Sequence, residues 1–295
     1  MPPGVRALST VLAGGTAPRD TPAVDRTLQT QLVRADLAQR DAAYVASVVP
    51  VLGRLMRLWF RSEVRGMDRI PVEGGALIVS NHSGGLMAMD VPIIASAFVE
   101  EFGAHRPFYV LAHDVLINNA AGAFFRRCGF LAANRDNADA VLSSGAVTIV
   151  FPGGDYDVAR PTSKANVIDF GGRTGYVRTA LGNGVPIVPV VSIGGQEAQL
   201  HLSRGELVAR LTGVASRFRF PYLPVSVGFP FGLSVGFPPN LPLPTKITTQ
   251  VLDPIDVEAE FGAEPDIAEV DEVVRGRMQD ALDELKRQRR FPVLG

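Results

Sequence analysis

The sequence predicts an α/β fold in which a largely parallel or mixed central sheet is flanked by helices. Short apolar runs of strand length alternate with longer segments of helical character along most of the 295 residues. Four such alternations follow one another, and parallel strands need crossover connections of this kind. The length and the 46% hydrophobic content suit one large α/β domain or two small ones.

The N-terminal region predicts a tail followed by helices. Residues 1–25 are rich in Pro, Gly, Ala and Thr without any period, so we expect a disordered tail. Residues 26–66 are expected to form an N-terminal helical hairpin, in which one helix covers 26–48 and Pro50 starts or kinks a second. The second helix places its apolar side chains on one face: Leu52, Leu55, Met56, Trp59 and Phe60. That face either packs on the core or lies in a membrane interface, with Trp59 at the level of the lipid headgroups.

The other predicted elements follow in chain order. Apolar runs bounded by glycine or polar residues predict strands over 76–80, 108–112, 129–135, 146–151, 185–193 and 247–252. Helices are expected over 91–98, 136–144, 171–183 and 267–290, and 115–128 is a helix or a loop. Because Pro186 and Pro189 lack a backbone N–H, the strand over 185–193 is expected at an edge or at a bulge.

Residues 218–244 differ from the rest of the chain because they are apolar yet rich in Pro and Gly. They show neither a helical nor a strand period, so we expect a long loop. Long ordered loops often carry function, and this one either covers a channel for an apolar substrate or touches a membrane. The alternative is a loop that only packs on the core.

Composition excludes several classes of protein. The net charge of −1 shows no broad basic excess, which argues against a nucleic-acid partner. A single cysteine, Cys128, excludes an internal disulfide and a multi-cysteine metal site, and no metal-ligand spacing is present. The mean hydropathy is positive, yet no uninterrupted run reaches the roughly 18 apolar residues of a membrane span. We therefore expect a cytoplasmic protein that associates peripherally with a membrane, because no signal-peptide pattern is evident.

The stretch from Asn81 to Asp90 carries the most specific chemistry in the sequence. It lies where the first expected strand ends and a helix begins, which is where α/β proteins bind ligands. His82 stands eight residues before Asp90, and a histidine oriented by a carboxylate is a general base that works near neutral pH. Gly84 and Gly85 let backbone N–H groups approach a ligand. By residue type alone, however, a histidine beside a turn is more often a polar turn residue.

Four blocks stand in order along the chain: Asn81-His82 with Asp90, Gly129-Phe130-Leu131-Ala132-Ala133-Asn134-Arg135, Phe151-Pro152-Gly153-Gly154, and Val185-Pro186-Ile187-Val188-Pro189-Val190. Taken together, they resemble the glycerolipid acyltransferase superfamily, whose best-known members are lysophosphatidic acid acyltransferases. The resemblance covers about residues 52–285 and implies an acyltransferase domain over residues 67–290.

The sequence departs from the superfamily pattern in two places. Seven residues separate His82 from Asp90, three more than usual. On a helix this shift turns the carboxylate by about 60° and adds one turn, so Asp90 is still expected to face His82 if the glycine segment is extended. Gly153 occupies the place of the usual glutamate. The resulting Phe-Pro-Gly-Gly form resembles the branch that includes monoacylglycerol and diacylglycerol acyltransferases and phytyl ester synthases, which makes a neutral lipid alcohol a plausible acceptor.

The resemblance implies an O-acyltransferase that moves a fatty acyl group from acyl-CoA or acyl-carrier protein to a lysophospholipid or neutral lipid. No metal or other cofactor is expected. His82 is the implied base and Asp90 the group that holds its tautomer. Two further readings stay open: a thioesterase or lipid hydrolase in which His82 activates water, and a non-catalytic lipid-binding protein.

Further residues are expected to bind substrate. Backbone N–H groups at two glycine pairs are candidate donors to the oxyanion of the reacting carbonyl, at Gly84, Gly85, Gly153 and Gly154. Asn81 is expected beside them, as part of the first block. Three arginines either hold a phosphate of the donor or acceptor or form surface salt bridges: Arg135, Arg160 and Arg173.

Overall fold

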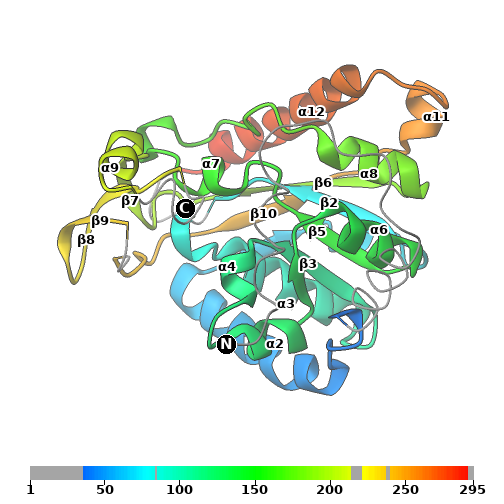
Figure 1. The fold of residues 1–295 in the computed structure, drawn as a ribbon, viewed down its shortest axis with the longest axis horizontal. Coiled ribbons are helices and arrows are strands. Elements are labelled where there is room, and N and C mark those ends of the chain that lie inside the picture. Colours follow the sequence, from blue (N-terminus) through cyan, green and yellow to red (C-terminus); the bar gives the residue numbers. More distant parts are fainter. Residues whose placement is uncertain (1–35, 84, 214–220, 237–239, 292–295) are drawn as a thin grey trace, which may run out of the picture.

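A seven-stranded mixed sheet forms the centre of the computed structural model, which describes residues 36–83, 85–213, 221–236 and 240–291 (Figure 1). The strand order is β1-β10-β6-β2-β5-β3-β4. These strands cover Glu63–Arg65 (β1), Ala76–Ser80 (β2), Phe108–Ala112 (β3), Phe130–Ala132 (β4), Val147–Val150 (β5), Ile187–Ile193 (β6) and Thr248–Val251 (β10). The run β6-β2-β5-β3-β4 is parallel, whereas β10 pairs antiparallel with β6, so the predicted α/β fold is confirmed.

The predicted edge or bulged position of residues 185–193 is wrong, because the strand pairs without a register shift on both sides. Strand β6 is buried along its whole length and lies between β2 and β10. Pro189 is accommodated because it lies just beyond the last paired residue of β10, Val251, which faces Val190. Its carbonyl still accepts a hydrogen bond from the N–H of Leu252 at 2.9 Å, so the proline removes only a terminal bond of that ladder.

Helices cover both faces of the sheet (Figure 1). One face carries Arg135–Ser143 (α6), Gly175–Asn183 (α8) and Ile267–Gln288 (α12), with Val257–Phe261 (α11) beside α8. The opposite face carries Asp90–Phe102 (α3), and Ala42–Phe60 (α2) packs on the outside of α3. Shorter helices follow β3, β5 and β7, namely Asp114–Ile117 (α4), Gly154–Val158 (α7) and Glu206–Leu211 (α9), and Gly122–Arg127 (α5) lies between α4 and β4. Single turns of 3-10 helix cover Met67–Arg69 (η1), Gly85–Met87 (η2) and Thr162–Lys164 (η3).

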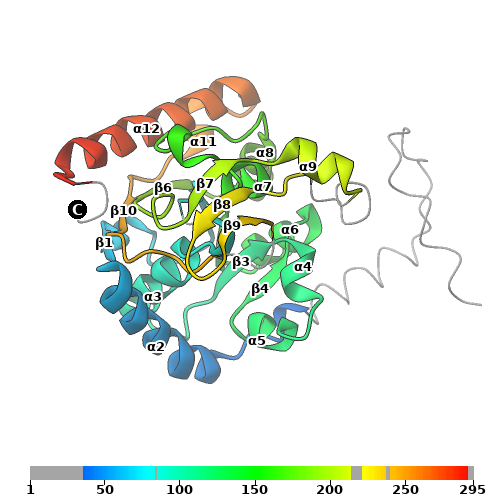
Figure 2. The same cartoon turned by 90° about the vertical axis from the view of Figure 1, so that its left-hand side faces the viewer.

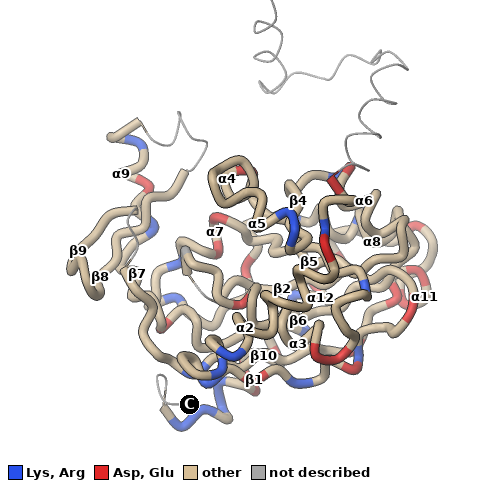
Figure 3. The backbone as a smooth tube through the Cα atoms, turned by 90° about the horizontal axis from the view of Figure 1, so that it is seen from below, with Lys and Arg blue, Asp and Glu red and all other residues tan. Residues whose placement is uncertain are grey.

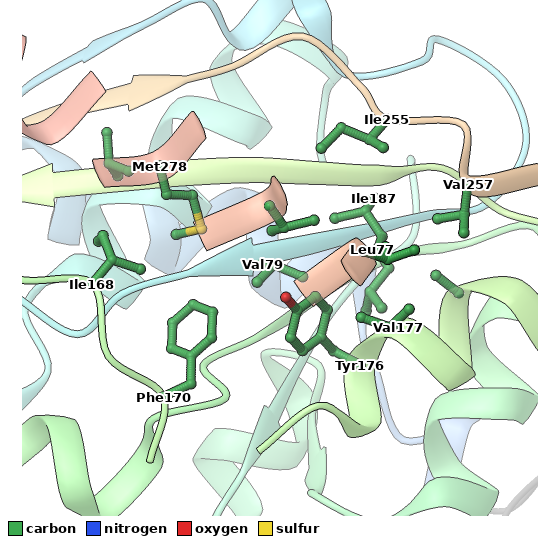
Figure 4. Packing of buried hydrophobic residues seen from close by; sticks show 14 of the residues in the cluster. Leu77, Val79, Ile168, Phe170, Tyr176, Val177, Ile187, Ile255, Val257 and Met278 are labelled. Carbon is green, nitrogen blue, oxygen red and sulfur yellow. The ribbon is translucent and has the colours of Figure 1, made fainter. Parts of the chain in front are cut away.

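The strand period divides the core between the two faces. In β2, Leu77 and Val79 point to the α8 and α12 side, where they pack with Tyr176 (Figure 4). Ala76 and Ile78 point to the α3 side. A strand that is buried on both faces in this way reads as a continuous apolar run, which is why the sequence identified it.

The N-terminal helices differ from the predicted hairpin. The tail predicted over 1–25 and the first ten residues of the helix expected over 26–48 lie outside the described residues. In the described part of the chain, α2 runs without a break through Pro50. Residues 38–41 are not helical and separate α2 from Asp36 and Leu37, which are helical. Packing against α3 on both sides of Pro50, through Val49 and Gly53, offsets the hydrogen bond that the proline removes.

The residues predicted to share one apolar face of α2 are divided between a buried and an exposed side. Phe60 is buried together with Val45 and Val49, whereas Leu55 and Trp59 lie on the exposed side. Two more apolar side chains share that exposed side: Val51 and Leu58. The helix is therefore apolar on both of its faces.

The long loop predicted over 218–244 contains regular structure. Residues 214–220 and 237–239 lie outside the described part of the chain, but Val225–Gly228 (β8) and Gly232–Val235 (β9) form an antiparallel hairpin. Leu200–Ser203 (β7) pairs with β8, which completes a second sheet of three strands. The alternation was missed because Pro and Gly interrupt it every few residues.

We predict that Leu77→Ala destabilises the fold by about 2–5 kcal/mol, because it leaves a cavity where the side chain is only 1% exposed. Val72→Ala, at a side chain 69% exposed just before the same strand, is the matched control and should change the free energy of unfolding by less than about 0.5 kcal/mol. Urea unfolding of both variants measures the difference. An equal loss of unfolding free energy in the two variants would contradict the packing of Leu77 described above.

Candidate active site

The first and third sequence blocks meet at the carboxyl edge of the sheet. His82 follows β2 and Phe151 follows β5, and these two strands are parallel neighbours in which Val79 lies opposite Val150. Carboxyl ends of parallel strands that lie side by side bring their loops together. Two segments about 70 residues apart in the sequence therefore form one site.

His82 and Asp90 form the pair that the sequence predicted. The imidazole Nδ1 lies 3.1 Å from Asp90 Oδ2, and the Asp90 side chain is completely buried. The backbone N–H and the hydroxyl of Ser83 also donate to Asp90, at 3.2 Å and 2.8 Å. Asp90 is the first residue of α3, where the helix dipole favours a negative charge. The carboxylate is thus fixed from several sides.

The long spacing between these residues is taken up by a turn. We expected an extended glycine segment, but Gly85–Met87 forms η2 and Ala88 adopts a left-handed conformation with φ 43°. The chain reverses there, and α3 starts beside the histidine. The conclusion that Asp90 faces His82 is confirmed, although the extended path behind it was wrong.

Phe151 covers one side of the histidine ring. Its ring stacks on His82 with a centroid separation of 3.9 Å and an interplanar angle of 6°. Because Nδ1 is engaged by Asp90, Nε2 is the ring nitrogen left for a substrate. The His82 side chain keeps 11% of its surface exposed, so the ring is held firmly yet reaches the surface.

A second buried carboxylate, Asp157 on α7, holds the backbone of the histidine. Its Oδ2 accepts a hydrogen bond from the His82 N–H at 2.7 Å, and its Oδ1 lies 2.8 Å from Arg160. Burial raises the pKa of Asp157, since desolvation outweighs the opposing attraction of Arg160 and His82. Sequence analysis did not single out Asp157, and the only available signal was its place one helical turn after the third block.

Arg160 lies in a different setting from the predicted substrate arginine. Its side chain is 3% exposed and, besides Asp157, it donates to the carbonyl of Asp169 at 2.9 Å. An arginine enclosed in this way is engaged within the protein. The geometry therefore supports a positioning role, through Asp157, in place of a contact with a phosphate.

Asn81 and Gly85 are also set into the surrounding structure. The Asn81 amide exchanges two hydrogen bonds of 2.9 Å with the backbone of Ser192, which extends the contact between β2 and β6. Gly85 has φ 58°, and a Cβ there would lie 2.4 Å from Oε1 of Gln199. Any other residue would need a left-handed backbone conformation and would also have to displace the Gln199 side chain, so glycine is favoured there. Gly84 lies outside the described residues.

The third block is held by Arg173. This arginine donates to the carbonyl of Gly153 at 2.7 Å and pairs with Asp155 at 2.6 Å. The N–H of Gly154 already donates to the Phe151 carbonyl at 2.9 Å. A Cβ at Gly153 would lie 2.5 Å from that of Asp157, which explains why a glutamate does not fit here.

Arg135 is the most accessible of the three predicted arginines. It is the first residue of α6, directly after β4, and its side chain is 72% exposed. Its ion pair with Asp139 is long at 3.5 Å and exposed. Among the described residues no group of three or more His, Cys, Asp or Glu side chains is placed to hold a metal ion.

Comparison with known proteins agrees with this arrangement. The fold is shared with the crystal structure of the 1-acyl-sn-glycerophosphate acyltransferase PlsC from Thermotoga maritima, at a TM-score of 0.53 and 17% identity, over 88% of this chain and 99% of that one. Residues 61–193 match the model of the family described as Acyltransferase.

Sequence relatives extend the comparison. Uncharacterized proteins of Mycobacterium bovis and Mycobacterium tuberculosis are 33% identical over 250 residues, which are 83% of this chain and 67% of theirs. The bovine protein named DGAT1/2-independent enzyme synthesizing storage lipids is 29% identical over 199 residues, which are 66% of this chain and 56% of that protein.

The chain belongs to the acyltransferase family, as its four sequence blocks predicted, and it is an acyltransferase. The residue roles within the site remain predictions that rest on the geometry described above.

We predict that Asp157→Ala lowers stability by about 3–5 kcal/mol, because it leaves Arg160 buried without its partner and the His82 N–H without an acceptor. Asp155→Ala, two residues away, removes a more exposed ion pair with Arg173 and should cost less than about 1 kcal/mol. Asp157→Asn keeps an acceptor for the His82 N–H and should fall between them. Chemical unfolding in urea ranks the three variants, and an equal cost for the two alanine variants would contradict a structural role for Asp157.

Proposed function

We propose that this acyltransferase transfers a fatty acyl group from the thioester of acyl-CoA or acyl-carrier protein to a hydroxyl of a glycerolipid. The observation that carries the proposal is the buried His82–Asp90 pair at the carboxyl edge of the sheet, in a chain of the acyltransferase family. A free alcohol is a poor nucleophile, and a base beside it is what this reaction needs.

His82 acts first, as the base. Its Nε2 takes the proton of the acceptor hydroxyl while the oxygen attacks the thioester carbon. Asp90 keeps the proton of the ring on Nδ1 and stabilises the imidazolium that forms, as the carboxylate does in a catalytic triad. No covalent acyl-enzyme is required, because the acceptor oxygen is itself the nucleophile.

The tetrahedral intermediate then collapses. The C–S bond breaks, the imidazolium returns the proton to the leaving thiolate, and the products are an ester and a free thiol. The oxyanion needs donors, and backbone N–H groups in the Gly84–Gly85 and Gly153 segments remain the candidates. The N–H of Gly154 is a weaker candidate because the Phe151 carbonyl already accepts from it.

A neutral lipid alcohol is the acceptor that the site supports best. Arg160 is enclosed with Asp157, and Arg173 is engaged by Gly153 and Asp155, so two of the three predicted phosphate ligands are already occupied. The similarity to an enzyme named for storage-lipid synthesis points the same way. Arg135 stays accessible, and with it a lysophospholipid remains the competing acceptor.

The reaction is proposed to take place at the inner face of a membrane, where a cytoplasmic thioester donor meets a lipid acceptor. Helix α2 is long and apolar enough to cross a membrane by length and composition, although Arg54 and Arg57 interrupt its apolar run. Only 22% of that stretch is buried inside the protein. These properties support association through α2.

We predict that His82→Ala lowers acyl transfer by about 10²-fold or more without unfolding the protein, from the size of general-base effects. Asp90→Asn should also impair transfer, because an amide cannot stabilise the imidazolium. His105→Ala is the control, since His105 is an exposed histidine ahead of β3, at the opposite edge of the sheet. Full activity in folded His82→Ala would remove His82 from the mechanism.

The assay uses palmitoyl-CoA with monoacylglycerol, diacylglycerol, a long-chain alcohol, lysophosphatidic acid and other lysophospholipids in separate reactions. Thiol release and lipid products are followed together. A new ester that depends on one acceptor and on His82 identifies the substrate. Thiol release with free fatty acid as the sole lipid product in every reaction would replace the transferase proposal with a thioesterase.

A further inference from the structure

The second sheet presents an unusual number of large apolar side chains to solvent. Seven of them lie on β7, β8, β9 and the β8–β9 turn: Leu200, Leu202, Val227, Phe229, Phe231, Leu233 and Val235. We call this set the hairpin surface. An exposed apolar cluster of this kind marks an interaction site more often than a plain surface.

The hairpin surface also lacks charge. Residues 221–245, which include both strands of the hairpin, contain no Lys, Arg, Asp or Glu. Figure 3 shows β8 and β9 without blue or red along their length. An interface between two proteins normally contains hydrogen bonds and has a polar rim, whereas a surface that enters the acyl region of a bilayer needs neither.

The hairpin surface continues into the exposed side of α2. The indole N–H of Trp59 donates to the Pro242 carbonyl at 3.0 Å, and the N–H of Leu241 donates to the Phe229 carbonyl at 2.8 Å. The segment 240–244 thereby joins the two, and it adds exposed Leu241 and Leu243. Figure 2 shows β8 and β9 in front of the main sheet, with α2 below them.

Basic residues border this apolar band. Arg54 and Arg61 lie on and after α2, and Lys246, which pairs with Glu63 at 3.3 Å, follows the uncharged stretch. Arg204 and Arg210 lie at the α9 end, where Glu206 is the acidic neighbour. An apolar band with cations at its rim matches the boundary between the acyl region and the headgroups of an anionic bilayer.

The band lies on the same side of the molecule as the candidate active site. Gln199, just before β7, packs against Gly85 in the loop that carries His82, and its amide donates to the carbonyl of Asn240 at 3.0 Å. Asn240 in turn holds the hairpin through the N–H of Phe231 and the carbonyl of Gly232. A lipid entering beside the hairpin is therefore close to the catalytic loop.

We propose that the hairpin surface is a membrane-docking element, which inserts Phe231 and Leu233 into an anionic bilayer beside α2. The proposal rests on the proposed function for its lipid substrate, but it concerns a surface and can fail separately. Full-length protein is floated with vesicles of equal parts phosphatidylcholine and phosphatidylglycerol, and the bound fraction gives the partition coefficient.

Leu233→Ser and Val72→Ser form a matched pair, because their side chains are 68% and 69% exposed at different parts of the surface. Leu233→Ser is expected to weaken vesicle binding, and the double variant Phe231→Ser with Leu233→Ser to weaken it by about tenfold or more, from the apolar area withdrawn from the lipid. Val72→Ser should bind like the unchanged protein. His82→Ala should also bind normally, since docking needs no turnover.

Turnover of a short-chain, water-soluble alcohol and thioester needs no membrane, so it tests the proposed acyl transfer separately from the proposed membrane docking. Unchanged turnover with lost vesicle binding in the double variant supports docking. Vesicle binding that is equal in the double variant and in Val72→Ser overturns it. Light scattering that finds a dimer for the unchanged protein and a monomer for the double variant also overturns the docking proposal. The hairpin surface would then be the contact with a second copy of the chain. Absence of turnover in the unchanged protein would count against the proposed function alone.

Discussion

Two buried carboxylates hold His82, and the rest of the site depends on this constraint. Asp90 accepts from the ring and from Ser83, while Asp157 accepts from the backbone N–H of His82 itself. Each carboxylate belongs to a helix that follows a different strand of the sheet. The histidine is therefore fixed in position and in rotation by elements that only the folded sheet brings together, and such rigidity suits the general-base role proposed for it.

The residues around His82 mostly hold the two carboxylates and the loop that carries the histidine. Asn81 ties the start of the loop to β6, and Arg160 compensates the buried charge of Asp157. Phe151 lies flat against the imidazole. Asn81 and Arg160, which the sequence analysis places among candidate substrate ligands, thus bond to the protein around His82.

The two sheets differ in how far their apolar side chains are buried. The main sheet is closed by helices on both faces, and its buried positions follow the strand period. The smaller sheet leaves apolar side chains at the surface, beside a helix that is apolar on two faces. The proposed active site thus lies on the main sheet, and the proposed membrane-docking surface lies on the smaller one.

Local patterns in the sequence determined the α/β class, the central strands β2 and β5, the long helix α12 and the candidate pair His82 and Asp90. Each depends on short-range periodicity or on residues a few positions apart. The position of β6 was misjudged, because a proline is excluded from a central strand only where its N–H has a partner, and Pro189 lies past the end of the neighbouring ladder.

Contacts between distant segments were decided by the tertiary structure alone. Which face of α2 is buried depends on α3, and the hairpin within 225–235 depends on pairing with β7. The Asp157 bond to His82 joins positions 75 residues apart in the sequence. No local period encodes such a contact, and it forms only because β2 and β5 lie side by side in the sheet.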